Sequence, residues 1–469
     1  MKAVGNKISF ALYFGNRGFF PGEVIASARE EMKKAVSDAG FGYICMDEEK
    51  TRYGAVETIA EGEKYAQFLE ENRGSFDGVI LCLPNFGDEN GASVALKNAN
   101  VPVLVQAYPD KIGEMDFAHR RDAMCGKFAM CNLLRQAGIP FTLTEKFVIE
   151  PLSDSFRNDL VNFASVCRIV KGMKHFNLGA IGARTTAFKT VRVDEIAFQK
   201  KGINIETIDL SDVFARAAKV PQARIDEKKA QILNITEFSG YPEEKLCTMA
   251  KVQAVFEDIV SEYNLQAVAV RCWNEFETVL GIAPCTSLCL LNELGISAAC
   301  EVDITNAVMM RALSLASDSP CMLLDYNNNY GESDDKAIMF HCGPIPPSML
   351  EGKGKIIEHL MFKKTFGEGT GVGVNKGKIK SGDITFGSIK TENGRICGFV
   401  SQGEFTDDKI EEEFFGSGKV VKKDNINNVS NYMAENGYKH HLAITYGSCA
   451  KAINEAFGKY LDFNIDVLK

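Results

Sequence analysis

The sequence predicts an α/β protein in which two doubly wound, Rossmann-like domains are followed by a mostly antiparallel, β-barrel-like C-terminal module. Strand-like and helix-like runs alternate through the first two thirds of the chain, and short segments punctuated by Gly replace them afterwards. A chain of 469 residues also exceeds one ordinary hydrophobic core. We expect α/β domains over residues 1–170 and 171–350, and the C-terminal module with its terminal helix over 351–469.

The first domain shows four apolar runs that alternate with helical patterns, as a parallel sheet with crossover helices requires. Strands are expected at residues 7–14, 41–46, 78–84 and 102–108, and helices at 22–39, 55–70 and 121–137. The second domain begins in the same way. Its expected elements are strands at 176–182, 203–208 and 267–271 and a helix at 242–263.

Two carboxylates stand out at the end of the second domain. Glu301 closes the apolar run 296–300 and Asp325 closes the next run, with an amphipathic helical segment capped by Asp303 between them. This order indicates a βαβ unit. If its strands are parallel neighbours, Glu301 and Asp325 meet at the carboxyl edge of one sheet, where open α/β sheets bind ligands. Two carboxylates so placed would repel each other unless a cation or proton lies between them.

The C-terminal module is predicted from alternating segments over residues 353–423, with a hairpin turn at Asn393-Gly394. The Gly-rich stretch 367–373 fits neither a P-loop nor a dinucleotide-binding fingerprint, so a loop or turn is expected there. A strand at 442–446 and a helix at 450–460 complete the chain.

Composition excludes several classes of function. The net charge is −9, which argues against nucleic-acid binding. No apolar run approaches the 18 residues of a membrane span, and the N-terminal residues lack the apolar core of a secretion signal, so a cytoplasmic protein without nucleic-acid or membrane partners is expected. Fourteen cysteines occur without a Cys-x-x-Cys motif, and their place inside apolar segments indicates buried, reduced thiols.

Histidine is scarce, with six in the chain, and three lie near apolar strands. His341 ends one apolar run, and His440 and His441 open the last predicted strand. With the carboxylates they form an oxygen and nitrogen donor set that suits Mn²⁺ or Mg²⁺. A tight hairpin between the run ending at His341 and the run ending at Asp325 would, however, place these two residues at opposite ends of the sheet.

An ordered set of motifs resembles the L-fucose and L-arabinose isomerase superfamily, in the manner of a short fucose isomerase-like member. The motifs are Cys300-Glu301-Val302-Asp303-Ile304-Thr305-Asn306-Ala307, Leu324-Asp325-Tyr326, Phe340-His341-Cys342-Gly343-Pro344 and His440-His441. The match covers the second domain and the C-terminal module in order and spacing. The segment 271–277, which holds the only tryptophan, also resembles the shorter members of the superfamily.

The resemblance implies roles for individual residues. Glu301 and Asp325 match the carboxylates that bind the divalent metal, usually Mn²⁺, and act as acid and base. His441 matches the metal-binding histidine, and His341 matches a further metal ligand of the arabinose isomerase branch. His440 is their neighbour and is expected to contact the substrate. The resemblance also implies a homo-oligomer, a hexamer or trimer, in which the N-terminal lobe of one subunit helps to cover the site of the next.

Four further residues are candidates for substrate binding. Arg17 follows the first strand and could reach a sugar hydroxyl or an anionic group, although a surface turn is an equal alternative. Trp273 offers an apolar face to a sugar, although a core aromatic is at least as common. Asn274 and Glu275 follow the same strand end and could hydrogen-bond the substrate.

Together these observations predict a metal-dependent aldose–ketose isomerase that acts on a free sugar or deoxysugar through a cis-enediol, with Mn²⁺, Co²⁺ or Mg²⁺ as cofactor. Fucose, arabinose, other pentoses and charged sugars such as sulfonated hexoses all remain open as substrates. One alternative is a non-enzymatic sugar-binding sensor built from two α/β lobes. Another is a cofactor-free racemase or epimerase that uses two cysteines, such as Cys82 and Cys285, as opposed acid and base.

Overall fold

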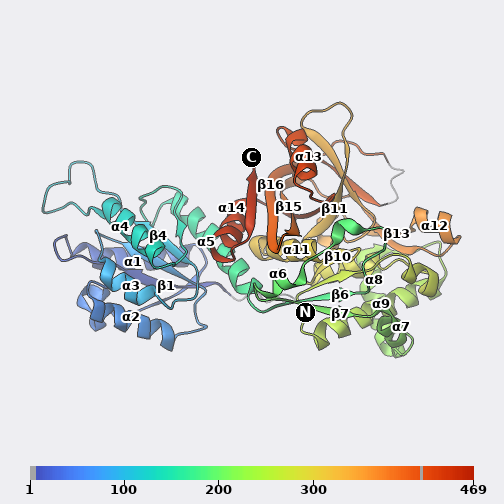
Figure 1. Ribbon diagram of the computed structural model, residues 1–469, viewed down its shortest axis with the longest axis horizontal. Helices are drawn as coiled ribbons and strands as arrows, with labels where there is room; N and C mark the ends of the chain where they lie inside the picture. The colour runs from blue at the N-terminus through green and yellow to red at the C-terminus, as the bar shows by residue number, and fades with distance from the viewer. Residues whose placement is uncertain (1–6, 412–415) are drawn as a thin grey trace. The chain divides into compact units, whose positions relative to one another are not determined.

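The structure is a computed structural model that describes residues 7–411 and 416–469 (Figure 1). Residues 1–6 and 412–415, which fall inside the predicted first and third domains, lie outside the described residues. The chain divides into two compact units. The N-terminal unit comprises residues 7–171 together with 455–462, and the site-bearing unit comprises residues 172–454 together with 463–469. No helix within the described residues is both long and apolar enough to cross a membrane.

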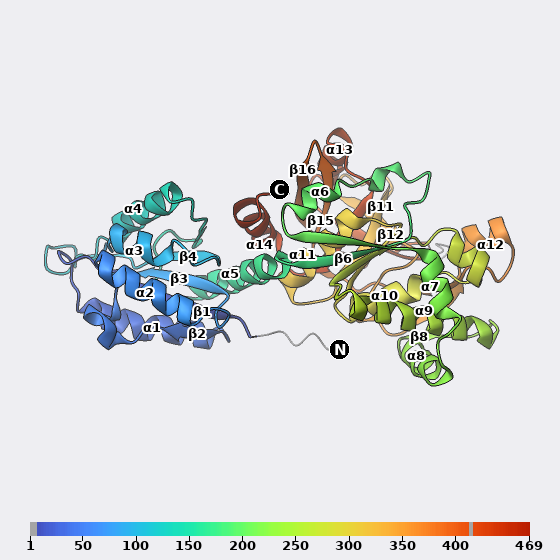
Figure 2. The same cartoon turned by 60° about the horizontal axis from the view of Figure 1, so that its bottom comes forward.

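The N-terminal unit is a five-stranded parallel sheet in the order β2-β1-β3-β4-β5, with helices on both faces (Figure 2). Its strands are β1 (Ser9–Phe14), β2 (Gly42–Cys45), β3 (Gly78–Leu83), β4 (Val103–Ala107) and β5 (Thr142–Leu143). Its helices are α1 (Val24–Asp38), α2 (Ile59–Glu71), α3 (Glu89–Leu96), α4 (Ala123–Gln136) and α5 (Asp154–Met173), with short turns at η1 (Glu48–Lys50), η2 (Arg52–Gly54) and η6 (Ala456–Tyr460). The predicted alternation of strands and helices in this region is therefore confirmed.

Both faces of this sheet are buried, which explains why its strands are continuous apolar runs. Along β1, Ala11 and Tyr13 face the core shared with α2, α3 and α4, whereas the ring of Phe10 stacks on Phe163 of α5 at 5.4 Å between centroids. The switch in strand order lies between β1 and β3. The loops that carry Arg17 and Asn85 follow these two strands, at the edge where doubly wound sheets usually bind ligands.

The site-bearing unit begins with a four-stranded parallel sheet in the order β10-β9-β6-β7. Its strands are β6 (Phe176–Ile181), β7 (Ile203–Ile208), β9 (Ala267–Val270) and β10 (Ser297–Cys300). The helices around it are η3 (Lys189–Val191), α6 (Glu195–Gln199), α7 (Leu210–Ala217), α8 (Gln222–Ile235), α9 (Glu243–Glu262), η4 (Phe276–Leu280), α10 (Cys285–Glu293) and α11 (Ile304–Ser317). The predicted strands and the long helix of the second domain are all present.

The expected parallel pairing of the two carboxylate-bearing strands is wrong. The strand before Glu301 is β10, an edge strand of the parallel sheet, but Asp325 lies on β11 (Met322–Asn329), which belongs to the antiparallel sheet. Helix α11 therefore crosses from one sheet to another instead of returning to its own. The apolar pattern of a strand, helix and strand is the same in both cases, which is why the sequence could not separate them.

The C-terminal sheet has seven strands in the order β15-β18-β11-β12-β17-β16-β19, and it is antiparallel except where β19 joins β16. Its other strands are β12 (Lys336–His341), β15 (Gly382–Glu392), β16 (Arg395–Phe405), β17 (Ser417–Lys422), β18 (His441–Tyr446) and β19 (Asn464–Leu468). Because β15 also pairs with β16, the pairings return to their starting strand. The predicted hairpin at Asn393-Gly394 joins β15 to β16 and is confirmed.

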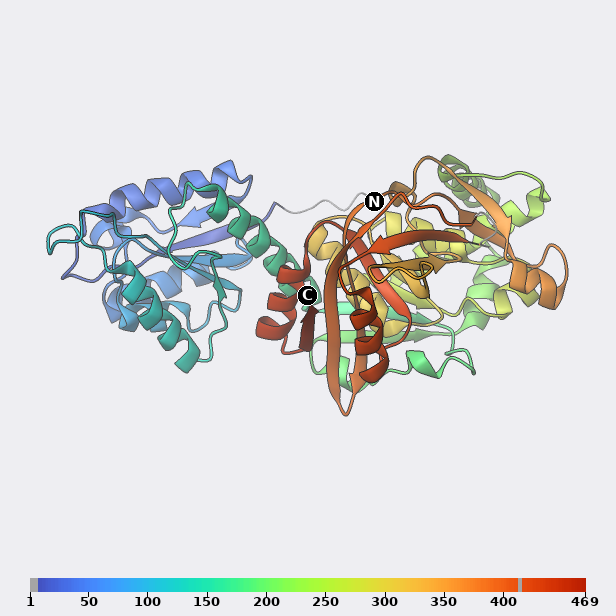
Figure 3. The same ribbon diagram turned by 90° about the horizontal axis from the view of Figure 1, so that it is seen from above.

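Helices and a small sheet complete this unit. Helices η5 (Pro347–Met349), α12 (Leu360–Phe366), α13 (Ile426–Glu435) and α14 (Ala450–Glu455) accompany the three-stranded sheet β14-β13-β8, formed by Val372–Lys376, Gly354–Glu358 and Thr236–Glu237. Helix α13 lies against the long β15–β16 hairpin (Figure 3), where the rings of Tyr432 and Phe399 are 5.8 Å apart. The Gly-rich stretch forms the turn between α12 and β14, and its backbone N–H groups at Gly369 and Thr370 donate to the carboxylate of Glu358.

Candidate metal centre

Glu301 is placed by the abrupt turn that joins β10 to α11. Glu301 and Val302 both have positive φ, at 60° and 57°, a left-handed conformation that is uncommon for residues with a β-carbon. The side chain of Asp303 then caps α11 by accepting the backbone N–H of Asn306 at 3.1 Å. The turn leaves Glu301 at the end of the parallel sheet with only 6% of its surface exposed. Backbone strain concentrated at one carboxylate is typical of functional sites.

Asp325 is placed by strand register. It pairs with His441 of β18 on one side and with Phe340 of β12 on the other. The tight hairpin that would carry His341 to the far end of the sheet does not form. Strand β11 continues past Asp325 to Asn329 before the chain turns, so His341 returns to the level of Asp325.

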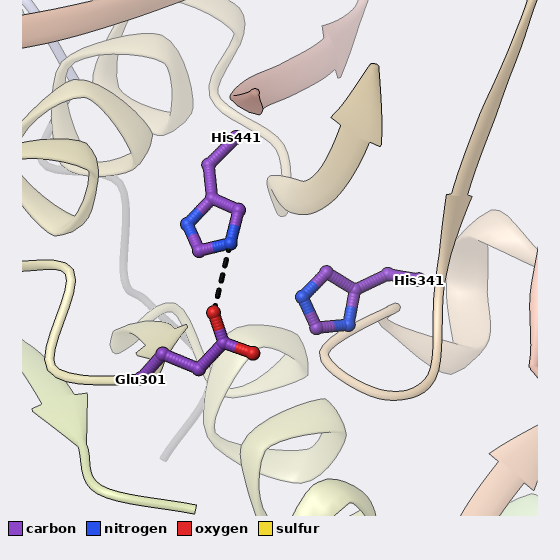
Figure 4. Close-up of side chains that lie close together, drawn as sticks. All are labelled: Glu301, His341 and His441. Atoms are coloured by element: carbon purple, nitrogen blue, oxygen red, sulfur yellow. Dashed lines mark ion pairs between the residues drawn. The ribbon is translucent and has the colours of Figure 1, made fainter. Parts of the chain in front are cut away.

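Glu301, Asp325 and the predicted histidines converge. The Nε2 atom of His441 lies 2.9 Å from Oε2 of Glu301 and 3.5 Å from Oδ1 of Asp325. Ligand atoms of Glu301, His341 and His441 all lie within 4.8 Å of one another (Figure 4), and so do those of Asp325, His440 and His441. The two groups share His441, so one compact cluster contains all five side chains.

Burial and close contacts shift the pKa values in this cluster. Burial disfavours a charged His441, but its hydrogen bonds with Asp303 and Glu301 outweigh burial and raise the pKa of the imidazole to about 10. Burial also opposes ionisation of Asp303, and the ammonium of Lys439 together with His441 overcomes it, so its pKa lies well below the usual value. Burial, aided by Glu301 and opposed by His441, raises the pKa of Asp325 to about 7. Without a cation, the cluster therefore holds protons at neutral pH.

His341 differs from His441 in its environment. It is 2% exposed, and burial, with the charge of His441 as a smaller cause, lowers its pKa well below the ordinary histidine value. Its Nδ1 accepts the backbone N–H of Gly343 at 3.2 Å and lies 3.4 Å from Sγ of Cys342. Its Nε2 is buried and has no hydrogen-bond partner among residues 7–411 and 416–469.

The donor set fits a divalent cation. Two carboxylates and imidazole nitrogen form the mixed hard and borderline set that Mn²⁺, Co²⁺ or Mg²⁺ accepts. Besides Nε2 of His341, Oδ1 of Asp325 is buried without a hydrogen bond from any described residue, although unsatisfied buried polar atoms are costly in a folded protein. The concentration of such atoms around one point indicates that the cluster is built for a ligand.

Two of the predicted substrate-binding residues border the cluster. His440 is exposed, and its Nε2 lies 3.8 Å from Oδ1 of Asp325. Trp273 is half-buried, and its ring packs against Phe188 and Phe362. Phe188 also lies 5.9 Å, between ring centroids, from both His440 and His441. An aromatic surface made by Phe188 and Trp273 therefore adjoins the histidines.

The other predicted substrate-binding residues are engaged elsewhere. Glu275 forms a bidentate ion pair with Arg271. Asn274 is exposed, and its backbone carbonyl accepts hydrogen bonds from the N–H and the hydroxyl of Thr278 in η4. Arg17 belongs to the N-terminal unit, where it pairs with Glu89 and lies over the ring of Phe86 at 4.2 Å. Glu275 is thus held in an ion pair and Arg17 lies in the other unit, whereas only the backbone of Asn274 is engaged by the described residues.

Sequence reasoning missed three residues that shape the site. The sequence pattern indicates only a helix cap at Asp303, yet this residue also accepts Nδ1–H of His441 at 2.8 Å. Lys439 is 5% exposed and pairs with Asp303 at 3.1 Å. A lysine directly before a His-His pair at the start of an apolar strand was the available signal, because a buried charge needs a partner. Phe188 lies in an irregular segment and gave no signal.

Two domain models of known sugar isomerases match this chain. The N-terminal domain model of the fucose/sulfoquinovose isomerases matches residues 11–174, and the C-terminal domain model of the L-fucose isomerases matches residues 339–469. The second match includes His341, His440 and His441. The two models cover the beginning and the end of the chain in the expected order.

Full-length relatives lead to the same family. The chain is 25% identical over 435 residues to a sulfoquinovose isomerase of Alkalicoccus urumqiensis, covering 88% of this chain and 90% of that protein. It is 22% identical over 419 residues to sulfoquinovose isomerases of Priestia aryabhattai and Priestia megaterium, covering 87% of this chain and 90% of each relative. These similarities confirm the resemblance seen in the motifs, and the chain belongs to the fucose isomerase-like family of aldose–ketose isomerases.

Proposed function

We propose that this protein is a metal-dependent isomerase that interconverts a free aldose and its 2-ketose through a cis-enediol. The observation that carries the proposal is the convergence of Glu301, Asp325 and His441 from two different sheets. We propose these three residues as the holders of the cation, Mn²⁺ or a similar ion such as Co²⁺ or Mg²⁺, with His341 facing the same point. The ring of strand pairings supports a small β-barrel as the scaffold of Asp325 and the histidines.

The residues present match the needs of the reaction. Moving a proton between C1 and C2 requires a base beside the sugar carbons and charge stabilisation at two adjacent oxygens. A bound divalent cation supplies that stabilisation as a Lewis acid. Glu301 and Asp325 are the bases available to take and return the proton.

The substrate proposed is a C6-modified hexose, with sulfoquinovose first. This rests on the names of the relatives in Alkalicoccus and Priestia, while L-fucose and L-arabinose follow from the motif resemblance. An anionic substituent requires a cationic partner, and the predicted candidate Arg17 lies in the N-terminal unit. The aromatic surface of Phe188 and Trp273 offers apolar contact to a sugar ring.

Assembly into a homo-oligomer is proposed as the way in which Arg17 reaches a site. The loops that follow β1 and β4 expose large apolar side chains: Phe19 is 84% exposed and Phe117 is 83% exposed. Apolar groups gathered on the loops at one edge of a sheet are typical of protein interfaces. We propose that this edge covers the site of another copy of the chain, within a trimer or hexamer.

The test uses the purified protein in D₂O with sulfoquinovose, L-fucose or L-arabinose, after EDTA treatment and again after addition of Mn²⁺, Co²⁺ or Mg²⁺. NMR should show ketose formation and deuterium at the carbon that receives the proton, only when the cation is present. Glu301→Gln and Asp325→Asn should abolish turnover. Asp318→Asn, at the exposed C-terminal cap of α11, is the matched control and should leave it unchanged.

Two results would reject this function. Turnover that persists in EDTA would exclude the role of the cation, and full activity of Glu301→Gln would exclude the site. Binding of sugar in EDTA without any turnover would favour the sugar-binding sensor. The cysteine-dependent racemase has little support, because burial raises the pKa of the Cys82 thiol well above its usual value. A thiol that stays protonated is a poor base and a poor nucleophile.

A further inference from the structure

The two histidines that face Glu301 have different partners at Nδ1. Their rings lie 5.9 Å apart between centroids. Each turns one ring nitrogen toward the cluster (Figure 4), which is Nε2 in both because Nδ1 is hydrogen-bonded to another group of the protein. A neutral imidazole carries one N–H, so the partner of Nδ1 decides whether Nε2 offers a lone pair or a hydrogen. Metal ions bind only the lone pair.

His441 has an acceptor at Nδ1. Its Nδ1–H donates to Oδ2 of Asp303 at 2.8 Å, and the carboxylate of Asp303 can only accept. Asp303 is fully buried and is held in place by Lys439 at 3.1 Å and by the side chain of Asn306 at 2.9 Å. Asn306 also donates to the backbone carbonyl of His441 at 3.0 Å. This arrangement keeps one hydrogen on Nδ1, so the ring proton that His441 gives up when a cation binds is the one on Nε2, and its lone pair then faces the cation.

His341 has a donor at Nδ1. The backbone N–H of Gly343 points at Nδ1 from 3.2 Å, and a backbone N–H cannot act as an acceptor. A hydrogen on Nδ1 would collide with it, so the hydrogen of the neutral ring must lie on Nε2. That Nε2 is buried, faces Glu301 and has no hydrogen-bond partner among the described residues. It is therefore a hydrogen donor that awaits an acceptor.

We propose that His441 is a ligand of the cation and that His341 is not. His341 instead donates Nε2–H to an oxygen of the sugar held beside the cation. The inference rests on the proposed isomerase function for its substrate, and it departs from the ligand role that the resemblance to arabinose isomerases implies for His341. Asp303 and Lys439 are positioning residues, because they act through His441.

Binding of Mn²⁺ alone separates the two histidines. The protein is stripped with EDTA, and free Mn²⁺ is counted by electron paramagnetic resonance for the wild type and for the matched variants His341→Gln and His441→Gln. We expect His341→Gln to keep the wild-type dissociation constant within about threefold. Mutation of a residue that hydrogen-bonds a metal ligand typically lowers metal affinity by ~10–100-fold. Removal of the ligand itself in His441→Gln should lower the affinity for Mn²⁺ by at least as much. Equal losses in the two variants would overturn the inference.

The donor role has its own readout. Gln at position 341 keeps an N–H donor whereas Leu does not, so His341→Leu should lose far more of kcat than His341→Gln while both bind Mn²⁺ like the wild type. Asp303→Asn should weaken Mn²⁺ binding by ~10–100-fold. Ser317→Ala is the control, because it removes a hydrogen bond between α11 and Thr445 of β18 without touching Asp303 or His441. Unchanged Mn²⁺ binding in this variant would show that the loss in Asp303→Asn does not come from a weaker contact between α11 and β18. Loss of kcat to the same extent in both His341 variants would overturn the donor role.

A measurement on the wild type covers the case in which variants fail to fold. Anomalous diffraction from a crystal soaked in Mn²⁺ should place the ion at coordinating distance from His441 Nε2, with His341 Nε2 beyond it. An ion bound directly to both nitrogens would overturn the inference while supporting the proposed function. A wild-type protein that binds no Mn²⁺ would instead reject the metal-dependent function itself.

Discussion

Binding of a divalent cation to the metal-free protein should release protons. The pKa of His441 is about 10, so at pH 7 the imidazole carries a proton that a ligand nitrogen must lose. The pKa of Asp325 is about 7, so about half of its carboxyl groups are protonated at that pH. Since ligands bind in their deprotonated form, Mn²⁺ should release about 1.5 protons per site at pH 7.

The pH dependence follows with a definite sign. Both pKa values are raised, so protons compete with the cation and the affinity should increase with pH. Near pH 6 the release should approach about two protons, and near pH 8.5 it should fall to about one, because only His441 still carries a proton there. Isothermal titration calorimetry of the EDTA-treated protein, in buffers with different ionisation enthalpies, measures this number directly.

A matched variant isolates the contribution of Asp325. In Asp325→Asn the release should stay close to one proton from pH 6 to pH 8.5, although binding is weaker. Release below about one proton at pH 7 in the wild type would contradict the raised pKa of His441, which alone should account for about one proton. If the number of protons released did not change between pH 6 and pH 8.5, the raised pKa of Asp325 would be contradicted.

Three other predictions concern single side chains. Phe188→Ala should lower kcat/KM about tenfold through the loss of packing against Trp273, His440 and His441, and steady-state kinetics that match the wild type would exclude a role for this ring. Phe386→Ala empties a fully buried position in the C-terminal core and should cost about 3–5 kcal/mol, seen as a lower urea midpoint; an unchanged midpoint would contradict the assigned burial. Gly394→Ala meets no neighbouring atom but must adopt a φ of 74°, so it should cost only about 1 kcal/mol, and a loss as large as that of Phe386→Ala would show that the turn is packed.

Much of the fold could be predicted from sequence because its signals are local. The strands of the N-terminal unit are apolar on both faces, and the Asn393-Gly394 turn has a specific backbone requirement. The partner of β11 could not be predicted, because the periodicity of residues 296–325 is the same whether the second strand joins the first sheet or another. Short elements such as α3 and β5 were missed because their patterns are too brief to detect.

The candidate site shows the same division. Glu301, Asp325, His341 and His441 were found as residue types at strand ends and through motif resemblance, and the structure brings them together. Their geometry depends on register: Asp325 meets His441 because β11 pairs with β18. Asp303 contacts His441 and Lys439 only because the fold buries the three side chains together. A single sequence does not reveal such burial.

The cluster draws its acidic groups from two sheets, since Glu301 extends from the parallel sheet while Asp325 and His441 belong to the antiparallel one. A cation bound by residues of both sheets would link the two sheets of this unit. Binding of the ion and packing of the sheets against each other would then be thermodynamically coupled. Removal of the ion should therefore weaken the contact between the two sheets. Amide hydrogens along α11, which connects the sheets, should exchange faster in EDTA than in Mn²⁺.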